Sequence, residues 1–139
     1  MISAARSSIS ALVAVSTSLA ARADNIANVR TSARVDEVSI GRSGGNRTAE
    51  ETYRPVRPTF VARDPSGVDV EIEPVDPSHR VAYDPRDSNA DEDGRVALPN
   101  IQLEDEFVGV LQDRAMFMAN LAVIRTADEM AGQLLDDEV

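Results

Sequence analysis

The apolar residues of the chain gather into two long patterns, one at each end. In residues 1 to 28 an apolar or small residue recurs every three or four positions, and Ser16 is the polar exception. The members of this pattern are Ile2, Ala5, Ile9, Leu12, Ser16, Leu19, Ala23 and Ile26. Such spacing places side chains on one face of a helix. We therefore predict a long N-terminal helix with a coiled-coil-like seam.

The second pattern occupies residues 103 to 135 and predicts a long C-terminal helix. Its apolar members are Phe107, Val110, Leu111, Phe117, Met118, Leu121, Ile124, Ala131 and Leu135. Arg114 and Asp128 interrupt the stripe, so we expect these two levels to meet solvent or a charged partner. Asn100, which follows Pro99, is the predicted N-cap, and the acidic residues 104 to 106 suit the positive end of the helix dipole.

Short alternating patterns between the two helices predict strands. The clearest is Gly67 to Glu73, with Val68, Val70 and Ile72 on one face and acidic residues on the other. Shorter strands are expected at residues 81 to 83 and 96 to 98, and residues 35 to 40 are a further candidate. Residues 53 to 58 contain two prolines and cannot form a central strand, although residues 59 to 62 can extend from them. The polar, glycine-containing residues 41 to 52 are predicted to be a mobile loop.

These elements predict an α+β fold, in which long N- and C-terminal helices pack as a coiled-coil-like pair with a small antiparallel β unit between them. The predicted segments are an N-terminal helix (1–30), a linker, loop and small β domain (31–100), and a C-terminal helix (101–139). A self-contained helical hairpin is one interpretation. However, two helices leave a second apolar flank uncovered, formed by Val108, Ala115 and Ala122, so we favour lateral assembly of several copies.

Composition narrows the possible functions. The chain has 139 residues and a net charge of −10, which opposes binding to nucleic acid or to an anionic membrane surface. All 14 basic residues are Arg and Cys is absent, which excludes lysine Schiff-base chemistry, disulfides and zinc–thiolate sites. No apolar run reaches the ~18 residues of a membrane span, so we expect none. The weakly hydrophobic N-terminus, with Ala21-Arg22-Ala23 resembling a cleavage site, is predicted to be retained.

Two short stretches are candidates for site chemistry. Asn89 to Gly94 places oxygen ligands at alternate positions and glycine sixth, as in a calcium loop. Its twelfth position is Asn100 rather than glutamate, which favours a solvated β-turn; a small calcium-dependent adaptor module is the alternative function. His79 stands beside Ser78 without a nucleophile elbow or second histidine, so we expect an exposed turn histidine rather than a hydrolytic site. We predict no catalytic residue, metal ligand, cofactor or small-molecule substrate.

Several segments resemble those of flagellar axial proteins. Asp24-Asn25-Ile26-Ala27-Asn28 is similar to the asparagine-flanked motif that ends the first helix of rod, hook and hook-associated proteins. Other segments resemble, more narrowly, the FlgC-type family of flagellar basal-body (proximal) rod proteins. They are Gly67-Val68-Asp69-Val70, Tyr83-Asp84-Pro85, the stretch from Ala90 to Ile101, Glu104-Asp105-Glu106-Phe107-Val108 and Ala119-Asn120-Leu121. Arg95 departs from the family pattern, which commonly has an aromatic residue after the turn glycine.

This resemblance implies a structural, non-enzymatic subunit of the rod that carries torque from the membrane ring to the distal rod and hook. It further implies export through the flagellar type III apparatus without a cleaved signal. Helical assembly would then follow in the periplasm, with self-association and contacts to other rod proteins and to adjoining membrane-ring or export-gate components. The two helical segments would form the axial core. The predicted assembly interface consists of Ile9, Leu12, Leu19, Asn25, Ile26, Asn28, Phe107, Val110, Phe117, Asn120, Leu121 and Ile124.

Overall fold

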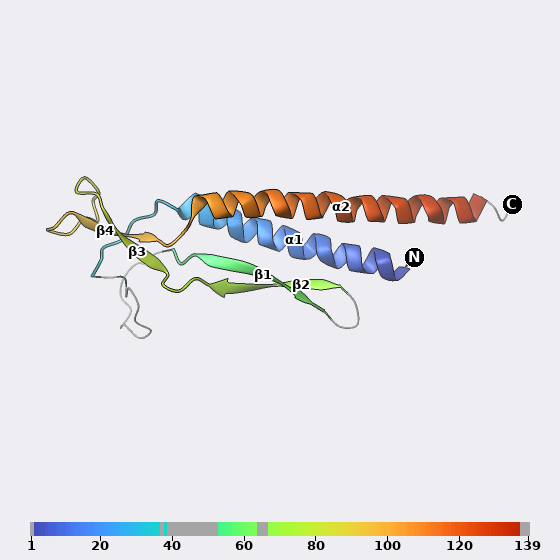
Figure 1. Cartoon of the computed structure of the whole chain (residues 1–139), viewed down its shortest axis with the longest axis horizontal. Helices are drawn as coiled ribbons and strands as arrows, with labels where there is room; N and C mark the ends of the chain where they lie inside the picture. The colour runs from blue at the N-terminus through green and yellow to red at the C-terminus, as the bar shows by residue number, and fades with distance from the viewer. Residues whose placement is uncertain (1, 37, 39–52, 64–66, 137–139) are drawn as a thin grey trace. The chain divides into compact units, whose positions relative to one another are not determined.

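The computed structural model confirms an α+β fold and describes residues 2–36, 38, 53–63 and 67–136 (Figure 1). The elements follow in the order α1 (Ile2–Asn28), β1 (Val56–Ala62), β2 (Val68–Pro74), β3 (His79–Tyr83), β4 (Arg95–Pro99) and α2 (Leu103–Asp136). The two terminal helices pack together, and the strands form two small antiparallel sheets, β1 with β2 and β3 with β4. The loop predicted at 41–52 lies outside the described residues.

The chain divides into two compact units. Unit 1 comprises Met1–Ala20, Pro58–Glu71 and Phe107–Val139, and unit 2 comprises Ala21–Arg57 and Ile72–Glu106. Each long helix therefore contributes residues to both units, as does the β1–β2 hairpin. The division into segments 1–30, 31–100 and 101–139 stays a prediction.

Both helices begin and end for local reasons. The α1 segment contains neither Gly nor Pro, and at its end Asn28 Nδ2 donates to the Asp24 carbonyl at 2.8 Å. The first helical hydrogen bond of α2 runs from Glu106 N to Gln102 O at 3.2 Å, which makes Gln102 the residue before the helix. The predicted Asn100 cap is therefore wrong. Its side-chain amide instead donates to the Pro77 carbonyl at 3.0 Å and so holds the preceding loop.

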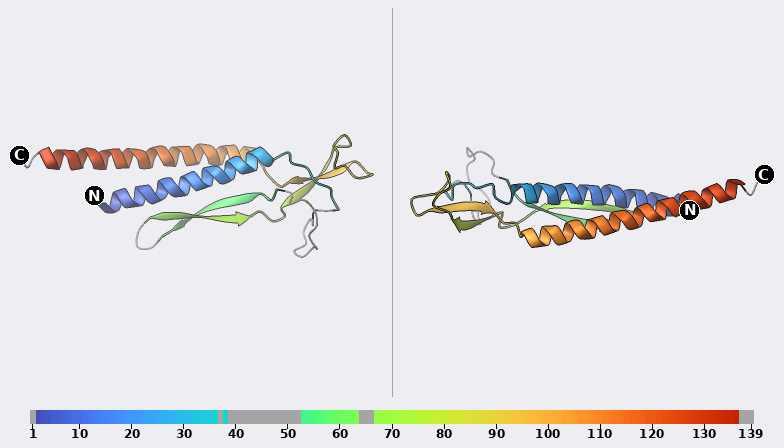
Figure 2. Two further views of the ribbon diagram at one scale, coloured as in Figure 1. Left: turned by 180° about the vertical axis from the view of Figure 1, so that it is seen from behind. Right: turned by 90° about the horizontal axis from the view of Figure 1, so that it is seen from above.

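In unit 1, α1 and α2 run antiparallel, and α1 lies between α2 and the β1–β2 hairpin (Figures 1 and 2). The hairpin lies close to α1 at Gly67, which has a φ of 119°. A Cβ at Gly67 would lie 2.5 Å from Ser10 Oγ, which accepts a hydrogen bond from Val68 N at 3.1 Å. Glycine is required here both for the backbone conformation and for the close contact. Pro58 fits within β1 because a two-stranded sheet consists of edge strands.

In unit 2, β3 and β4 pair antiparallel from His79 opposite Pro99 to Tyr83 opposite Arg95. Ala33 adds a bridge to the free edge of β4, with two backbone hydrogen bonds to Ala97 of 2.9 Å each. The candidate strand at 35–40 is not formed where it is described, because residues 35 and 36 lie in a turn. The core of the unit contains the buried apolar side chains of Ala33, Val96, Ala97 and Ile101.

His79 is buried, contrary to the expected exposed turn histidine. It begins β3, where its Nδ1 lies 2.8 Å from Ser78 Oγ. Burial lowers the pKa of His79, an effect that the Tyr53 backbone opposes and the Arg54 charge reinforces. The histidine is thus a neutral core residue of unit 2.

Candidate assembly surface

The face of α1 that is covered within the subunit is small and polar. Its buried residues are Ser8, Ala14, Val15, Ser18 and Asn25. The apolar seam predicted from the sequence lies about one position away, and Ile9 on it is 54% exposed. Leu12, Leu19 and Ile26 on the same seam are half-buried. The more hydrophobic face of α1 is therefore not the one that the subunit covers.

A buried hydrogen bond explains the choice of face in unit 1. Ser18 Oγ donates to Asp113 Oδ2 at 2.6 Å, and both residues are buried, with exposures of 0% and 1%. A buried carboxylate is strongly destabilising unless hydrogen-bond donors surround it, so this contact favours one rotation of each helix. Arg114 is exposed, as expected for a polar break in the stripe, whereas the burial of its neighbour Asp113 is not predicted by the sequence pattern. The seven-residue spacing of Glu106, Asp113 and Asn120 was the sequence signal for a polar stripe.

Asn25 is the centre of a second polar cluster, in unit 2. Its Nδ2 donates to Val56 O at 2.7 Å and to Glu106 Oε1 at 2.6 Å. Its Oδ1 accepts from the Tyr53 hydroxyl at 2.6 Å and from Val56 N at 3.1 Å. Glu106 Oε2 also pairs with Arg22 at 3.1 Å. The side-chain amide thus makes all the hydrogen bonds it can, and it joins the start of β1 to both helices.

Most of the remaining predicted interface residues on α2 share the three- and four-residue spacing of buried Asp113, which places them on the covered side of the helix, and their role in assembly stays a prediction. Phe107 is exposed, while Val110, Phe117, Leu121 and Ile124 are half-buried. The amides of Asn28 and Asn120 are half-buried and donate to backbone carbonyls one helical turn earlier. Exposed large apolar residues of unit 1 that the predicted interface omitted are Val13, Val108, Leu111, Met116, Met118, Val123, Met130 and Leu134. The outward apolar surface is larger than the single seam that we predicted.

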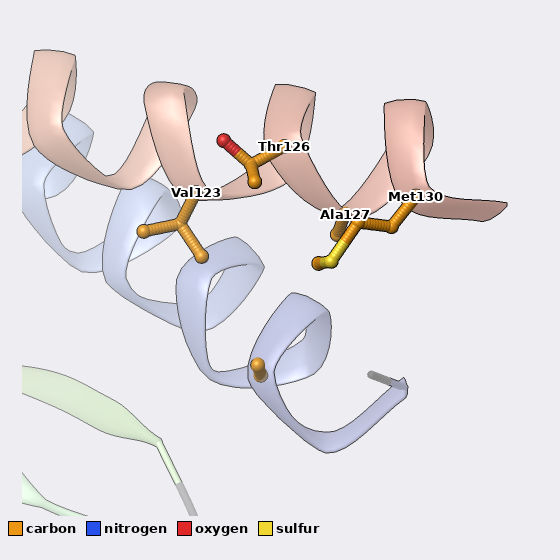
Figure 3. A pocket seen from close by; sticks show the side chains of 5 residues that line it. Val123, Thr126, Ala127 and Met130 are labelled. Atoms are coloured by element: carbon orange, nitrogen blue, oxygen red, sulfur yellow. The ribbon is translucent and has the colours of Figure 1, made fainter. Parts of the chain in front are cut away.

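An apolar groove opens between the two helices of unit 1 (Figure 3). It has a volume of about 360 Å³ and is lined by Ala4 of α1 and by Val123, Thr126, Ala127 and Met130 of α2. Ala4 and Ala127 have side chains too short to fill the space between the two helices, so the helix pair is loosely packed here. Val123 and Met130, which line the groove, also belong to the exposed apolar residues of α2.

Judged by length and composition alone, both helices could cross a membrane. The mean hydropathy is 1.2 for Ser3–Asn28 and 1.3 for Leu103–Leu134. Core helices of soluble proteins and signal sequences pass the same test, so the prediction that no segment spans a membrane stays a prediction. It considered uninterrupted apolar runs, whereas the average includes many alanines and tolerates the few charges. A helix that neighbouring subunits cover has the same composition as one that lipid covers.

The candidate calcium loop forms a turn in unit 2 whose carboxylates already have partners. Asp91 accepts from Arg95 N at 2.8 Å and from Arg95 Nε at 2.9 Å, and Asp93 pairs with Arg95 at 2.9 Å. These hydrogen bonds, first of all the one from the Arg95 backbone, lower the pKa of Asp91. Among the described residues no group of three or more His, Asp or Glu side chains is arranged to hold a metal ion. The arrangement favours the β-turn interpretation.

Comparison with known proteins gives one informative similarity. No protein-family model matches the chain. The flagellar basal-body rod protein FlgC of Aquifex aeolicus is 36% identical over 69 residues, which is 48% of this chain and 52% of the relative. The chain thus spans about half the length of the curated relative that it matches. This finding agrees with the resemblance carried by the motifs: over about half of its sequence, the chain is similar to a flagellar basal-body rod protein of the FlgC type.

Proposed function

We propose that the protein is a structural subunit of the flagellar basal-body rod, which assembles with copies of itself and with other rod proteins through the outward faces of α1 and α2. The observation that carries this proposal is the large apolar surface that the two helices leave exposed. The subunit covers Ser18 and Asp113, and it leaves Val13 and Leu111 exposed by 63% and 64%. Burying one such side chain contributes about 1.5–3 kcal/mol, so a partner that covers the outward face is strongly favoured.

The same proposal assigns roles to the segments. The terminal segments 1–30 and 101–139 form the axial core of the assembly, and residues 31–100 make contacts around it. Torque is then carried by distributed side-chain packing, with no chemical step and no cofactor. Export without a cleaved signal and assembly in the periplasm are part of this proposal and rest on the similarity to a rod protein.

Leu111→Asp tests the proposal. Leu111 is exposed, so a charge there leaves the fold of the subunit intact but places a carboxylate in the proposed interface. We expect the variant to be folded by circular dichroism and to fail to enter rods or to restore motility in a host that lacks its own copy. Ser88→Asp, at an exposed position outside both helices, is the control. Normal swimming with Leu111→Asp would refute the helix-face interface.

The predicted seam offers a second pair of variants. Leu19→Asp and Leu121→Asp alter half-buried seam positions, so both are expected to abolish incorporation as well. They are less specific than Leu111→Asp, since each also changes side-chain packing within the subunit.

A further inference from the structure

The middle of α2 carries exposed positive charge in a chain that is acidic as a whole, and the exposed acidic residues Asp128 and Glu129 follow it on the same helix. The chain has a net charge of −10, yet between Phe107 and Thr126 the charged residues are Asp113, Arg114 and Arg125. Asp113 is buried and both arginines are exposed. Within the described part of the chain neither arginine makes an ion pair. An apolar helix face with two unpaired positive charges favours an acidic partner.

The arginines lie in line with exposed apolar residues. Leu111, Arg114, Met118 and Arg125 follow one another by three, four and seven positions, which is the spacing of one helix face. The two arginines are eleven residues apart, about 16 Å along the helix axis at ~1.5 Å per residue. A partner must therefore present acidic groups over a similar length.

This protein carries such an acidic surface on β2. Asp69, Glu71 and Glu73 alternate along the strand, share one face and are exposed. The first and last are four residues apart, about 13 Å at ~3.3 Å per residue. Glu71 and Glu73 make no ion pair within the described part of the chain. Asp69 makes a solvent-exposed ion pair of 3.5 Å with Arg63 and accepts a hydrogen bond from Val70 N at 2.9 Å.

We propose that the basic face of α2, formed by Leu111, Arg114, Met118 and Arg125, docks on the acidic face of β2 in a second copy of this chain. The contact is between molecules because, in unit 1, α1 lies between α2 and the subunit's own β1–β2 hairpin (Figures 1 and 2). The inference rests on the proposed self-assembly and specifies which surface of one copy contacts which surface of the next. Since two different surfaces of each copy are used, a copy that docks through one surface keeps the other free for the next copy, which allows a ring or a helix to form.

An anionic membrane is the other acidic surface that two arginines and an apolar stripe fit. The net charge of −10 opposes an anionic membrane and a second copy alike, but β2 of a second copy offers a row of carboxylates whose length is similar to the separation of the two arginines. The observations therefore favour the strand, and binding to lipid is one outcome of the test.

Charge reversal on each surface tests the inference. One variant carries Arg114→Glu and Arg125→Glu, so that both its surfaces are acidic; the other carries Glu71→Arg and Glu73→Arg, so that both are basic. We expect each variant alone to self-associate at least about tenfold more weakly than the natural chain, measured by analytical ultracentrifugation at low salt. An equimolar mixture of the two is expected to regain assembly, because each surface then finds its complement on the other variant. Arg86→Glu and Glu92→Arg, exposed positions between β3 and β4, serve as control substitutions.

The outcomes separate the two proposals. If both variants assemble like the natural chain, or if the mixture assembles no better than its components, the α2–β2 contact is refuted while a rod subunit with a different interface still stands. If the natural chain stays monomeric at all concentrations and Leu111→Asp has no effect in cells, both proposals fail. Binding to phosphatidylglycerol vesicles that is lost in Arg114→Glu/Arg125→Glu and unchanged in Glu71→Arg/Glu73→Arg overturns the docking in favour of a lipid surface.

Discussion

At the scale of single residues, the two polar clusters fix the helix pair more specifically than apolar packing does. Apolar side chains can pack against one another in several helix registers at similar free energy. Asn25 and Asp113, by contrast, each require particular hydrogen-bond partners at particular positions. A shift of either helix leaves a buried amide or carboxylate without those partners. The clusters therefore act against alternative registers of α1 and α2, at the expense of some stability.

Asn25→Asp measures this requirement with almost no change in shape. The substitution removes both Nδ2 donors and places a carboxylate beside Glu106, which now accepts from Asn25 at 2.6 Å. We expect a loss of about 3 kcal/mol in the free energy of unfolding, because two acceptors lose a donor and a buried negative charge meets the half-buried carboxylate of Glu106. Urea denaturation followed by circular dichroism gives the value.

Asn28→Asp is the matched control for that substitution. Asn28 belongs to the same sequence motif, but it is half-buried and donates to a backbone carbonyl of its own helix. It is expected to lose less than about 1 kcal/mol. Equal losses for the two variants would show that the Asn25 cluster has no special place in the fold.

The sequence supports inferences about residue types better than about their surroundings. The prediction for His79 is wrong, and Asp113 is not singled out by the sequence, for the same reason: a polar residue next to a turn, or next to an arginine, is exposed by default. Each is buried because of contacts that no local pattern contains. Ser78 and the pairing of β3 with β4 position His79, and Ser18, 95 residues away in sequence, donates to Asp113.

At the scale of elements, the bounds of the helices are well predicted and their faces are not. The period of three and four identifies α1 and α2 and places their ends within a few residues, since Gly and Pro are absent from α1 and an acidic first turn begins α2. The spacing alone does not decide which face of α1 is buried. The series that begins at Ser8 and the series that begins at Ile9 both recur every three or four residues. Tertiary hydrogen bonds decided between them in favour of the less hydrophobic series.

Gly67→Ala tests how the β1–β2 hairpin is held on α1. The added methyl group would lie 2.5 Å from Ser10 Oγ, and the φ of 119° is disfavoured for any residue with a Cβ. We expect a loss of about 2 kcal/mol in unfolding free energy, together with faster hydrogen exchange at the Val68 amide that bonds to Ser10.

The control for Gly67→Ala is Gly132→Ala in α2. At Gly132 a Cβ meets no atom within 4 Å, and the residue is inside a helix, so alanine should stabilise the protein by about 0.5–1 kcal/mol. Should Gly67→Ala also stabilise the protein, the close contact between hairpin and helix would not exist in solution.

At the scale of the whole molecule, the uneven burial of α2 determines how the free subunit behaves. Every described residue of α2 from Asp128 to Leu134 is exposed, so the last turns of this helix are held by little more than their own backbone hydrogen bonds. Isolated helical turns of this kind are marginal in water. Assembly that covers the outward face would stabilise the same turns, so the end of α2 should be loose in the free subunit and ordered in the assembly.

Limited digestion with trypsin tests that coupling, because every basic residue of the chain is Arg. In a dilute monomer we expect cleavage after Arg125 to release residues 126–139 well before cleavage after Arg80 or Arg95 within the β3–β4 sheet, since the sheet must unfold to admit the protease. In assembled protein the Arg125 site should become resistant, while Leu111→Asp, which we expect to remain monomeric, should be cut at the monomer rate. Mass spectrometry of the released peptide follows both reactions. A natural chain that resists cleavage at Arg125 while dilute would mean that a single subunit already covers the end of α2, and the physical basis for lateral assembly would be lost.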